Sequence, residues 1–268
     1  MSVSNHLFQR VDSMMGSDTV FLLFTFFMFP IMLFSINEVI VMQSRELKEA
    51  IIYREYISKN LESSENLQVE RKDKTVFSNK HLNTGKGLIF YPEKQFTSVS
   101  YGPLMRRLAE EGIFCVLIDI PYIIYDPLKV IKPSEIIEKY PDIKDWYIAG
   151  HSSGGRLACS YIKEMSEKLS GLILLGAYPD PQNSLGSEKI KVLSIYAGKD
   201  RMTPPVKVEK AKEYLPAETE YYFIPEGDGI QFSWYFQNFG SDAGIGLALQ
   251  QDEVFKQMLS FIMEKNDM

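Results

Sequence analysis

A Gly-x-Ser-x-Gly pentapeptide between an apolar stretch and a helical pattern constrains this chain more than any other feature. The pentapeptide runs from Gly150 to Gly154 with Ser152 at its centre, after apolar residues 146–149 and before the helical pattern of 153–168. A serine between a strand and a helix occupies a tight, strained turn, and the flanking glycines let the two elements approach. The pattern predicts Ser152 as a nucleophile; the alternative is an ordinary Gly/Ser turn between strand and helix.

Apolar runs and amphipathic segments alternate from about residue 66 onward. Runs without polar alternation predict buried strands, and apolar residues three and four positions apart predict helices. The segments 67–69 and 75–77 predict an edge hairpin. Buried strands are expected at 87–91, 114–120, 147–149, 171–175, 192–197 and 221–224, and helices at 99–111, 153–168, 207–214 and 250–265. We therefore expect an α/β fold with a mostly parallel central sheet and helices on both faces.

The N-terminal part of the chain has a different composition. Residues 19–37 carry no charge, and the apolar character resumes at 39–42 after Glu38. This stretch is long enough to cross a bilayer as a helix, and Pro30 is tolerated in such a helix. A cleaved signal peptide is the alternative, but Asp12 and Asp18 in the leader and the lack of a small-residue cleavage site disfavour it. A buried core helix is disfavoured because the run is apolar on all faces.

These patterns divide the chain into four expected parts. They are an N-terminal tail at 1–18, a transmembrane helix at 19–42, a helical stalk at 43–65 and a globular domain at 66–268. The lipid bilayer is the expected partner, through residues 19–42. Arg10 is the only basic residue before the span, whereas Arg45, Lys48 and Arg54 follow it, which favours a cytoplasmic position for the globular domain.

Charge and metal-ligand spacing exclude several classes of function. The chain of 268 residues has a formal net charge of −6 and shows no basic stripe, so nucleic acid is not an expected partner. Cys115 and Cys159 lie inside apolar runs and are expected to be small buried side chains. No His, Cys and carboxylate cluster has metal-ligand spacing, and no dinucleotide fingerprint is present. The sequence predicts neither a metal nor a cofactor.

Several motifs resemble the α/β-hydrolase superfamily, and most of all a branch of dienelactone-hydrolase-like proteins, several of which have an N-terminal membrane helix. The resemblance covers about residues 85–262 and is carried by the segments 87–92, 101–104, 108–112, 119–121, 146–155, 171–175 and 177–179. It implies an α/β-hydrolase fold, preceded here by one transmembrane helix. It also implies a serine hydrolase that acts on a small ester or related acyl substrate.

The resemblance implies roles for residues around Ser152. The acid of the family lies in a Gly-x-Asp-like turn after a late strand, which Gly198-Lys199-Asp200 matches; a helix-capping Asp is the alternative. The oxyanion hole is expected to use the backbone N–H of Ser153 and a donor from the loop after Pro92. Glu93 stands there instead of the usual small residue. A carboxylate beside a developing oxyanion is unfavourable unless it points away.

The chain lacks the histidine that would complete a triad. Its three histidines are His6, His81 and His151, and none follows Ser152. The family's histidine lies in a Gly-Gly-Asn-His-like segment before Gln-Phe, and the matching position here is Gly229. His151 is a poor base for its neighbour because consecutive side chains diverge at such a turn. His81 is expected at the opposite end of a strand from the site.

Two hypotheses follow from this absence. In the first, the protein is a membrane-anchored serine hydrolase whose base is not recognised; Asp228 and Glu226 would be weak bases. In the second, it is a catalytically weak or inactive relative that keeps the fold as a ligand-binding or scaffold module. Removal of a triad member leaves only residual catalysis, which favours the second. A purely structural membrane protein, the third class, would have no ligand-sized cleft at Ser152.

Overall fold

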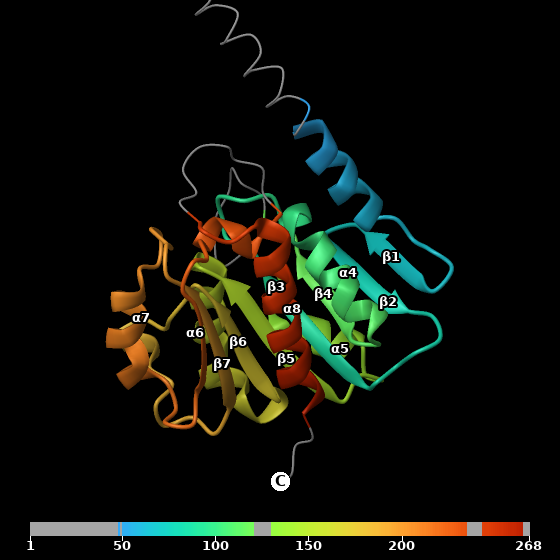
Figure 1. Ribbon diagram of the computed structural model, residues 1–268. Helices are drawn as coiled ribbons and strands as arrows, with labels where there is room; N and C mark the ends of the chain where they lie inside the picture. Colours follow the sequence, from blue (N-terminus) through green and yellow to red (C-terminus); the bar gives the residue numbers. More distant parts are fainter. Residues whose placement is uncertain (1–47, 49, 121–129, 235–242, 265–268) are drawn as a thin grey trace, which may run out of the picture. The chain divides into compact units, whose positions relative to one another are not determined.

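A computed structural model describes residues 48, 50–120, 130–234 and 243–264 (Figure 1). The expected tail at 1–18 and transmembrane helix at 19–42 lie outside the described residues. In the part that is described, no helix is both long and apolar enough to cross a membrane. The chain divides into Met1–Ile52 and Tyr53–Met268, and the second unit carries the sheet. Residues 50–60, within the expected stalk, are helical.

One mostly parallel sheet forms the centre of the second unit. Within the described residues it has eight strands in the order β1-β2-β4-β3-β5-β6-β7-β8. The strands are β1 (Leu67–Arg71), β2 (Lys74–Asn79), β3 (Lys86–Tyr91), β4 (Phe114–Ile118), β5 (Asp145–His151), β6 (Gly171–Leu175), β7 (Lys191–Ala197) and β8 (Glu220–Ile224). β2 pairs antiparallel with β1 and β4, and the other neighbours pair in parallel. The predicted edge hairpin and mostly parallel sheet are confirmed.

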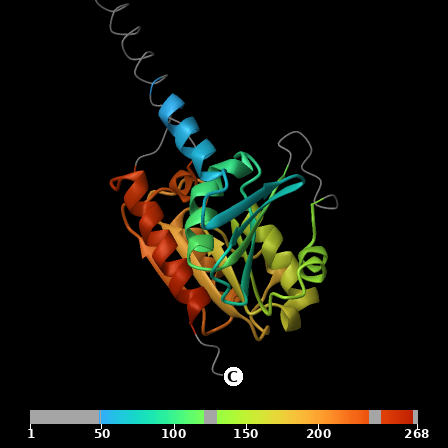
Figure 2. The ribbon, with the colours of Figure 1, turned by 90° about the vertical axis from the view of Figure 1, so that its right-hand side faces the viewer.

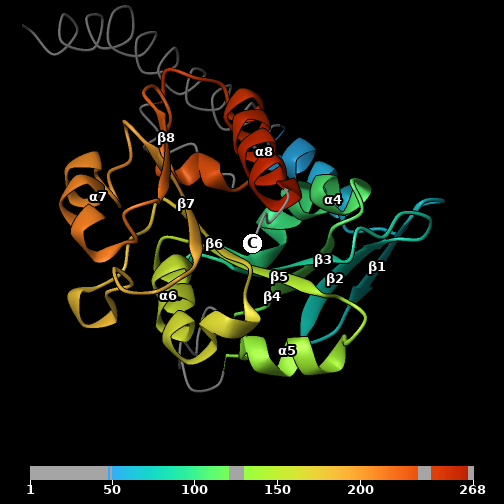
Figure 3. The ribbon, with the colours of Figure 1, turned by 90° about the horizontal axis from the view of Figure 1, so that it is seen from below.

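Helices cover both faces of this sheet, as the sequence predicts. They are α4 (Gly102–Glu110), α5 (Pro133–Lys139), α6 (Ser153–Met165), α7 (Pro205–Ala211) and α8 (Leu247–Met263). Side chains of α4 and α8 pack with one face, and side chains of α5 and α6 pack with the other (Figure 3). Figure 2 shows the same layers from the side, with the red α8 and the yellow α6 separated by the strands.

Strand alternation produces these two layers. Leu88 and Phe90 of β3 belong to the core beneath α4 and α8, whereas Ile89 and Tyr91 belong to the core beneath α5 and α6. Successive side chains of a strand point to opposite faces, so a continuous apolar run fills both cores at once. This is why the central strands are recognisable as unbroken apolar runs.

Some element bounds differ from the expected ones. The helix expected at 99–111 is a 3-10 turn, η2 (Ser98–Tyr101), followed by α4, which has Pro103 in its first turn. Proline has no N–H and a fixed φ, so it is suited to the first turn of an α-helix rather than to its interior. The described residues also contain α5, a short helix that the sequence pattern did not indicate.

The topology brings three expected site positions to one edge of the sheet. Ser152 directly follows β5, Asp200 lies in the turn after β7, and Gly229 begins the 3-10 turn η7 (Gly229–Phe232) after β8. β5, β7 and β8 run in the same direction, so their carboxyl ends meet at the same edge.

Candidate active site

The turn at Ser152 has the strained backbone that the pentapeptide predicts. Ser152 has φ 47° and ψ −111°, and it is the only non-glycine residue with positive φ in the described chain. A Cβ atom on Gly150 would collide with the backbone of Gly154, and one on Gly154 would collide with the carbonyl oxygen of Tyr91. The N–H of Ser152 donates to the carbonyl oxygen of Leu175 at 3.0 Å. Glycine is thus required on both sides, and β6 holds the turn.

Asp200 is buried and oriented by the turn after β7. Its Oδ1 accepts hydrogen bonds from the backbone N–H groups of Met202 and Thr203, both at 2.8 Å. Its Oδ2 is buried and has no hydrogen-bond partner among the described residues. Burial raises the pKa of the Asp200 carboxyl, the two N–H groups oppose this shift, and the charge of Asp228 adds to it. One carboxylate oxygen therefore stands without the imidazole that a triad would supply.

Gly229 lies directly against this carboxylate. A Cβ atom on Gly229 would collide with the carboxyl carbon and with both oxygens of Asp200. The structure therefore brings Gly229 and Asp200 together. It also shows that the backbone of residue 229 occupies space next to the acid, so a side chain larger than hydrogen cannot enter unless the loop or Asp200 moves.

Buried glutamines of α8 hold the loop in this position. Gln250 donates from Nε2 to the carbonyl oxygen of Asp228 at 2.8 Å and accepts from the N–H of Asp228 at 3.0 Å. Gln251 donates to the carbonyl oxygen of Gln231 at 2.7 Å. Buried amides are stable only when they are hydrogen-bonded, so this pairing fixes the loop. The sequence signal was the polar pair Gln250-Gln251 inside an apolar helical pattern, and sequence reasoning assigned it no role.

The carboxylate of Glu93 points toward the expected oxyanion hole rather than away from it. Glu93 is 2% exposed, and its Oε2 accepts from the backbone N–H of Ser153 at 2.8 Å and from the Ser153 hydroxyl at 2.7 Å. The positive end of α6 and these two donors attract the negative charge. The N–H of Glu93, the expected second donor, instead donates to the hydroxyl of Tyr101 at 3.2 Å. Both expected N–H donors are therefore engaged in this structure.

These contacts also determine the protonation of Glu93. Burial alone would raise the pKa of this carboxyl, but hydrogen bonds from Ser153 and Ser152 and the proximity of His151 hold it below the usual value. Glu93 is thus ionised at neutral pH and is a weaker base than an ordinary carboxylate.

Neither of the two histidines in the described part of the chain is placed to act as a base for Ser152. His151 is fully buried, its Nδ1 lies 2.7 Å from the hydroxyl of Tyr101, and its ring packs against Phe96 and Phe232. Burial lowers the pKa of His151 to about 4, although the charge of Glu93 opposes this shift. His81 is exposed in the segment before β3, and His6 lies outside the described residues.

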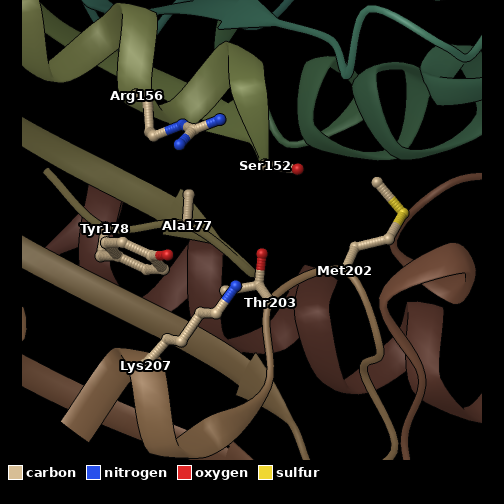
Figure 4. A pocket seen from close by; sticks show the side chains of 7 residues that line it. All are labelled: Ser152, Arg156, Ala177, Tyr178, Met202, Thr203 and Lys207. Carbon is tan, nitrogen blue, oxygen red and sulfur yellow. The ribbon is translucent and has the colours of Figure 1, made fainter. Parts of the chain in front are cut away.

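A small pocket opens beside Ser152 (Figure 4). It has a volume of about 140 Å³ and is lined by Ser152, Arg156, Ala177, Tyr178, Met202, Thr203 and Lys207. Sequence reasoning missed Arg156 and Lys207, because they lie on two helices far apart in the chain. No group of three or more His, Cys, Asp or Glu side chains that could hold a metal occurs among the described residues.

Solved structures with the same fold include hydrolases. An esterase from Exiguobacterium antarcticum is 13% identical with a TM-score of 0.53, and the match covers 71% of this chain and 96% of the esterase. A predicted CIB-like hydrolase from Thermoplasma acidophilum is 14% identical with a TM-score of 0.53, and the match covers 73% of this chain and 97% of the hydrolase. A dienelactone hydrolase from Anabaena variabilis is 18% identical with a TM-score of 0.49, and the match covers 72% of this chain and 97% of that enzyme. The first two likenesses show the fold alone.

A family model assigns the sequence more directly. A search of curated proteins found no match to this sequence. Residues 87–253 match the model of the alpha/beta hydrolase family. This match spans β3 to the first half of α8, including the turn at Ser152, the acid turn at Asp200 and the loop at Gly229. The chain therefore belongs to the alpha/beta hydrolase family.

Proposed function

We propose that this protein uses its site at Ser152 to bind a small acyl or ester ligand and does not hydrolyse it through a Ser-His-Asp triad. The observation that carries the proposal is the Glu93 carboxylate on the backbone N–H of Ser153. In a serine hydrolase this N–H stabilises the negative oxygen of the tetrahedral intermediate. A carboxylate in that place fills the donor and would repel the developing charge.

The missing base supports the same proposal. Gly229 stands where the family has histidine, and its backbone lies against Asp200. Loss of one oxyanion donor costs on the order of 10²–10³ in rate, and loss of a triad member costs several orders more. The lowered pKa of Glu93 makes this residue a poor replacement for the base.

We further propose that residues 19–42 anchor the protein in a lipid bilayer, with the domain of residues 66–268 on the cytoplasmic side. The uncharged stretch at 19–37 supports the span, and Arg45, Lys48 and Arg54 support the orientation. Placement in the dienelactone-hydrolase-like branch is also a proposal, supported by the segments 87–92 and 146–155. Loss of the protein from the membrane fraction when residues 1–42 are deleted would test the anchor, and digestion by protease added outside intact cells would contradict the orientation.

Two observations favour a second candidate function, an active ester hydrolase. Ser152 has a strained φ, and Asp200 is oriented by two N–H groups while its Oδ2 has no partner among the residues that the structure describes. A strained backbone persists only where the surrounding structure holds it, and such residues are concentrated at functional sites. Catalysis would then require a ligand that displaces Glu93 and a base supplied by that ligand or by a rearranged loop.

One experiment separates the two functions. The full-length protein in detergent micelles is incubated with a fluorophosphonate probe and, separately, with p-nitrophenyl acetate, beside Ser152→Ala and Asp200→Ala. We expect no labelling of Ser152 and no turnover above that of Ser152→Ala. Labelling of Ser152 together with turnover that Ser152→Ala abolishes would overturn the binding function and establish the hydrolase. Gly229→His is a poor reactivation test, since its side chain would collide with Asp200.

A further inference from the structure

The pocket beside Ser152 is lined by polar and cationic groups. Five of its lining residues carry a hydroxyl, a guanidinium or an ammonium group, namely Ser152, Arg156, Tyr178, Thr203 and Lys207, and no acidic residue is among the lining. Figure 4 shows Arg156 and Lys207 on opposite sides of the space, on α6 and α7, with Thr203 beside the ammonium group of Lys207. This gathering of positive charge contrasts with the net charge of −6 of the whole chain.

Neither cation is neutralised well by the protein. The Nη1 atom of Arg156 lies 3.7 Å from Oδ1 of Asp180, and both side chains are more than one third exposed. Exposed pairs at such a distance contribute little, and a guanidinium has five N–H donors to satisfy. Lys207 makes no ion pair with another residue of the described chain, while its neighbour Lys212 on the same segment pairs with Glu209.

Arg156 lies in the first turns of α6, directly after Ser152 and Ser153. The N–H of Arg156 donates to the carbonyl oxygen of Ser152 at 3.1 Å, and the first turn of this helix of 13 residues contains no acidic residue. The N-terminus of a helix carries partial positive charge, and the Glu93 carboxylate on Ser153 compensates it on the buried side. A negative group in the pocket would pair with both cations on the exposed side.

We infer that the pocket receives a small oxyanion group of the ligand, a carboxylate or a phosphate, between Arg156 and Lys207 and next to Ser152. The inference rests on the proposed ligand-binding function, because it gives the ligand of that site a chemical class. The volume of about 140 Å³ is well below the roughly 300–1,000 Å³ of pockets that enclose a whole drug-sized ligand. The pocket therefore takes the charged end of a ligand, and the remainder extends into solvent.

Isothermal titration of the full-length protein in detergent micelles at low ionic strength tests this. The probes are succinate, inorganic phosphate and the neutral dimethyl succinate, with sodium chloride matched for ionic strength. The variants are Arg156→Gln, Lys207→Gln and the double variant, with Lys210→Gln as a matched control, since Lys210 lies exposed on α7 outside the pocket lining. A hydrogen bond to a charged group contributes enough that each single variant should weaken binding roughly tenfold or more. Lys210→Gln should bind as the unchanged protein does.

The outcomes separate this inference from the proposed function. Binding of succinate or phosphate that both pocket variants weaken supports the inference, and the tighter of the two probes identifies the oxyanion. Equal affinity for dimethyl succinate, no binding of either anion, or unchanged anion binding by the double variant overturns it. Turnover of p-nitrophenyl acetate by Ser152, with anion binding that still depends on both cations, would overturn only the absence of hydrolysis.

Discussion

The two halves of the site differ in how far they keep the geometry of a hydrolase. At Ser152 the backbone has the strained φ of 47°, and glycines at 150 and 154 allow the close approach of strand and helix. At Gly229 the loop lies against Asp200 and is fixed by Gln250 of α8. The geometry of the turn at Ser152 depends on backbone conformation and on two glycines. A working triad at Asp200 would in addition require an imidazole and the space to hold it. The turn at Ser152 can therefore keep its geometry although the loop at Gly229 leaves no space for an imidazole beside Asp200.

The largest expected loss of stability comes from a substitution in the turn at Ser152. Gly154→Ala would place a methyl group against the carbonyl oxygens of Tyr91 and Pro92, which are backbone atoms that cannot rotate away. We expect a loss of about 3 kcal/mol or more in the free energy of unfolding, or failure to fold. Gly246→Ala is the control, because a Cβ atom there meets nothing within 4 Å, and its cost should be about 1 kcal/mol or less. Urea unfolding measures both.

The second effect is a pH dependence of the free energy of unfolding, which arises from the buried side chain of His151. Burial lowers the folded-state pKa of His151 to about 4, from the usual value of 6.5. The unfolded chain therefore binds more protons between these values, and stability is lost as the pH falls from above 6.5 through about 4. The difference corresponds to about 3 kcal/mol.

Urea unfolding across this pH range, compared with His151→Phe, measures that dependence. The aromatic variant keeps a buried ring but does not titrate, so its stability should change less between pH 7 and pH 4. An equal slope in both proteins would contradict a buried neutral His151.

A smaller loss of stability is expected from a substitution in the loop at Gly229. Gly229→Ala should cost about 2 kcal/mol, because its methyl group would displace the carboxylate of Asp200. In an Asp200→Ala background the same change should cost less, because the colliding atoms are gone. A double-mutant cycle of unfolding free energies measures the coupling. A cost that is equal in both backgrounds would show that the close approach is not what limits residue 229.

The smallest effect is expected from a substitution of Glu93, which contacts the half of the site at Ser152. Glu93→Gln removes the charge that Ser153 and the start of α6 stabilise, but it keeps one oxygen as an acceptor for the N–H of Ser153. We expect a loss of about 1–2 kcal/mol at pH 7, typical of a hydrogen bond to a charged group. Because the folded-state pKa of Glu93 is lowered, this difference should shrink as the pH falls through that pKa. A difference that does not change with pH would contradict an ionised Glu93.

The fold was largely predictable because buried strands and helices have recognisable patterns of apolar residues in the sequence. β3 and β6 contain unbroken apolar runs, since residues on both sides of each strand are buried. The turn at Ser152 is marked by the local pattern Gly-x-Ser-x-Gly. That Gly229 takes the family's histidine position stays a prediction; the structure shows that residue 229 lies against Asp200.

The orientation of Glu93 and the cationic pocket were not predictable in this way. The side chain of Glu93 is held by Ser153, which lies far along the chain and becomes a neighbour only when β3 and β5 pair. Arg156 and Lys207 are exposed side chains in separate helices, and no periodicity distinguishes them from other surface cations. Such features depend on tertiary packing rather than on local pattern.

The two hydrogen bonds between Gln250 and Asp228 have a consequence for any attempt to engineer a base into this site. A histidine at position 229 would need the loop to move away from Asp200, and that movement would break two buried hydrogen bonds to α8. Introduction of an imidazole here would therefore require changes in the loop and in α8 together, rather than the single substitution Gly229→His.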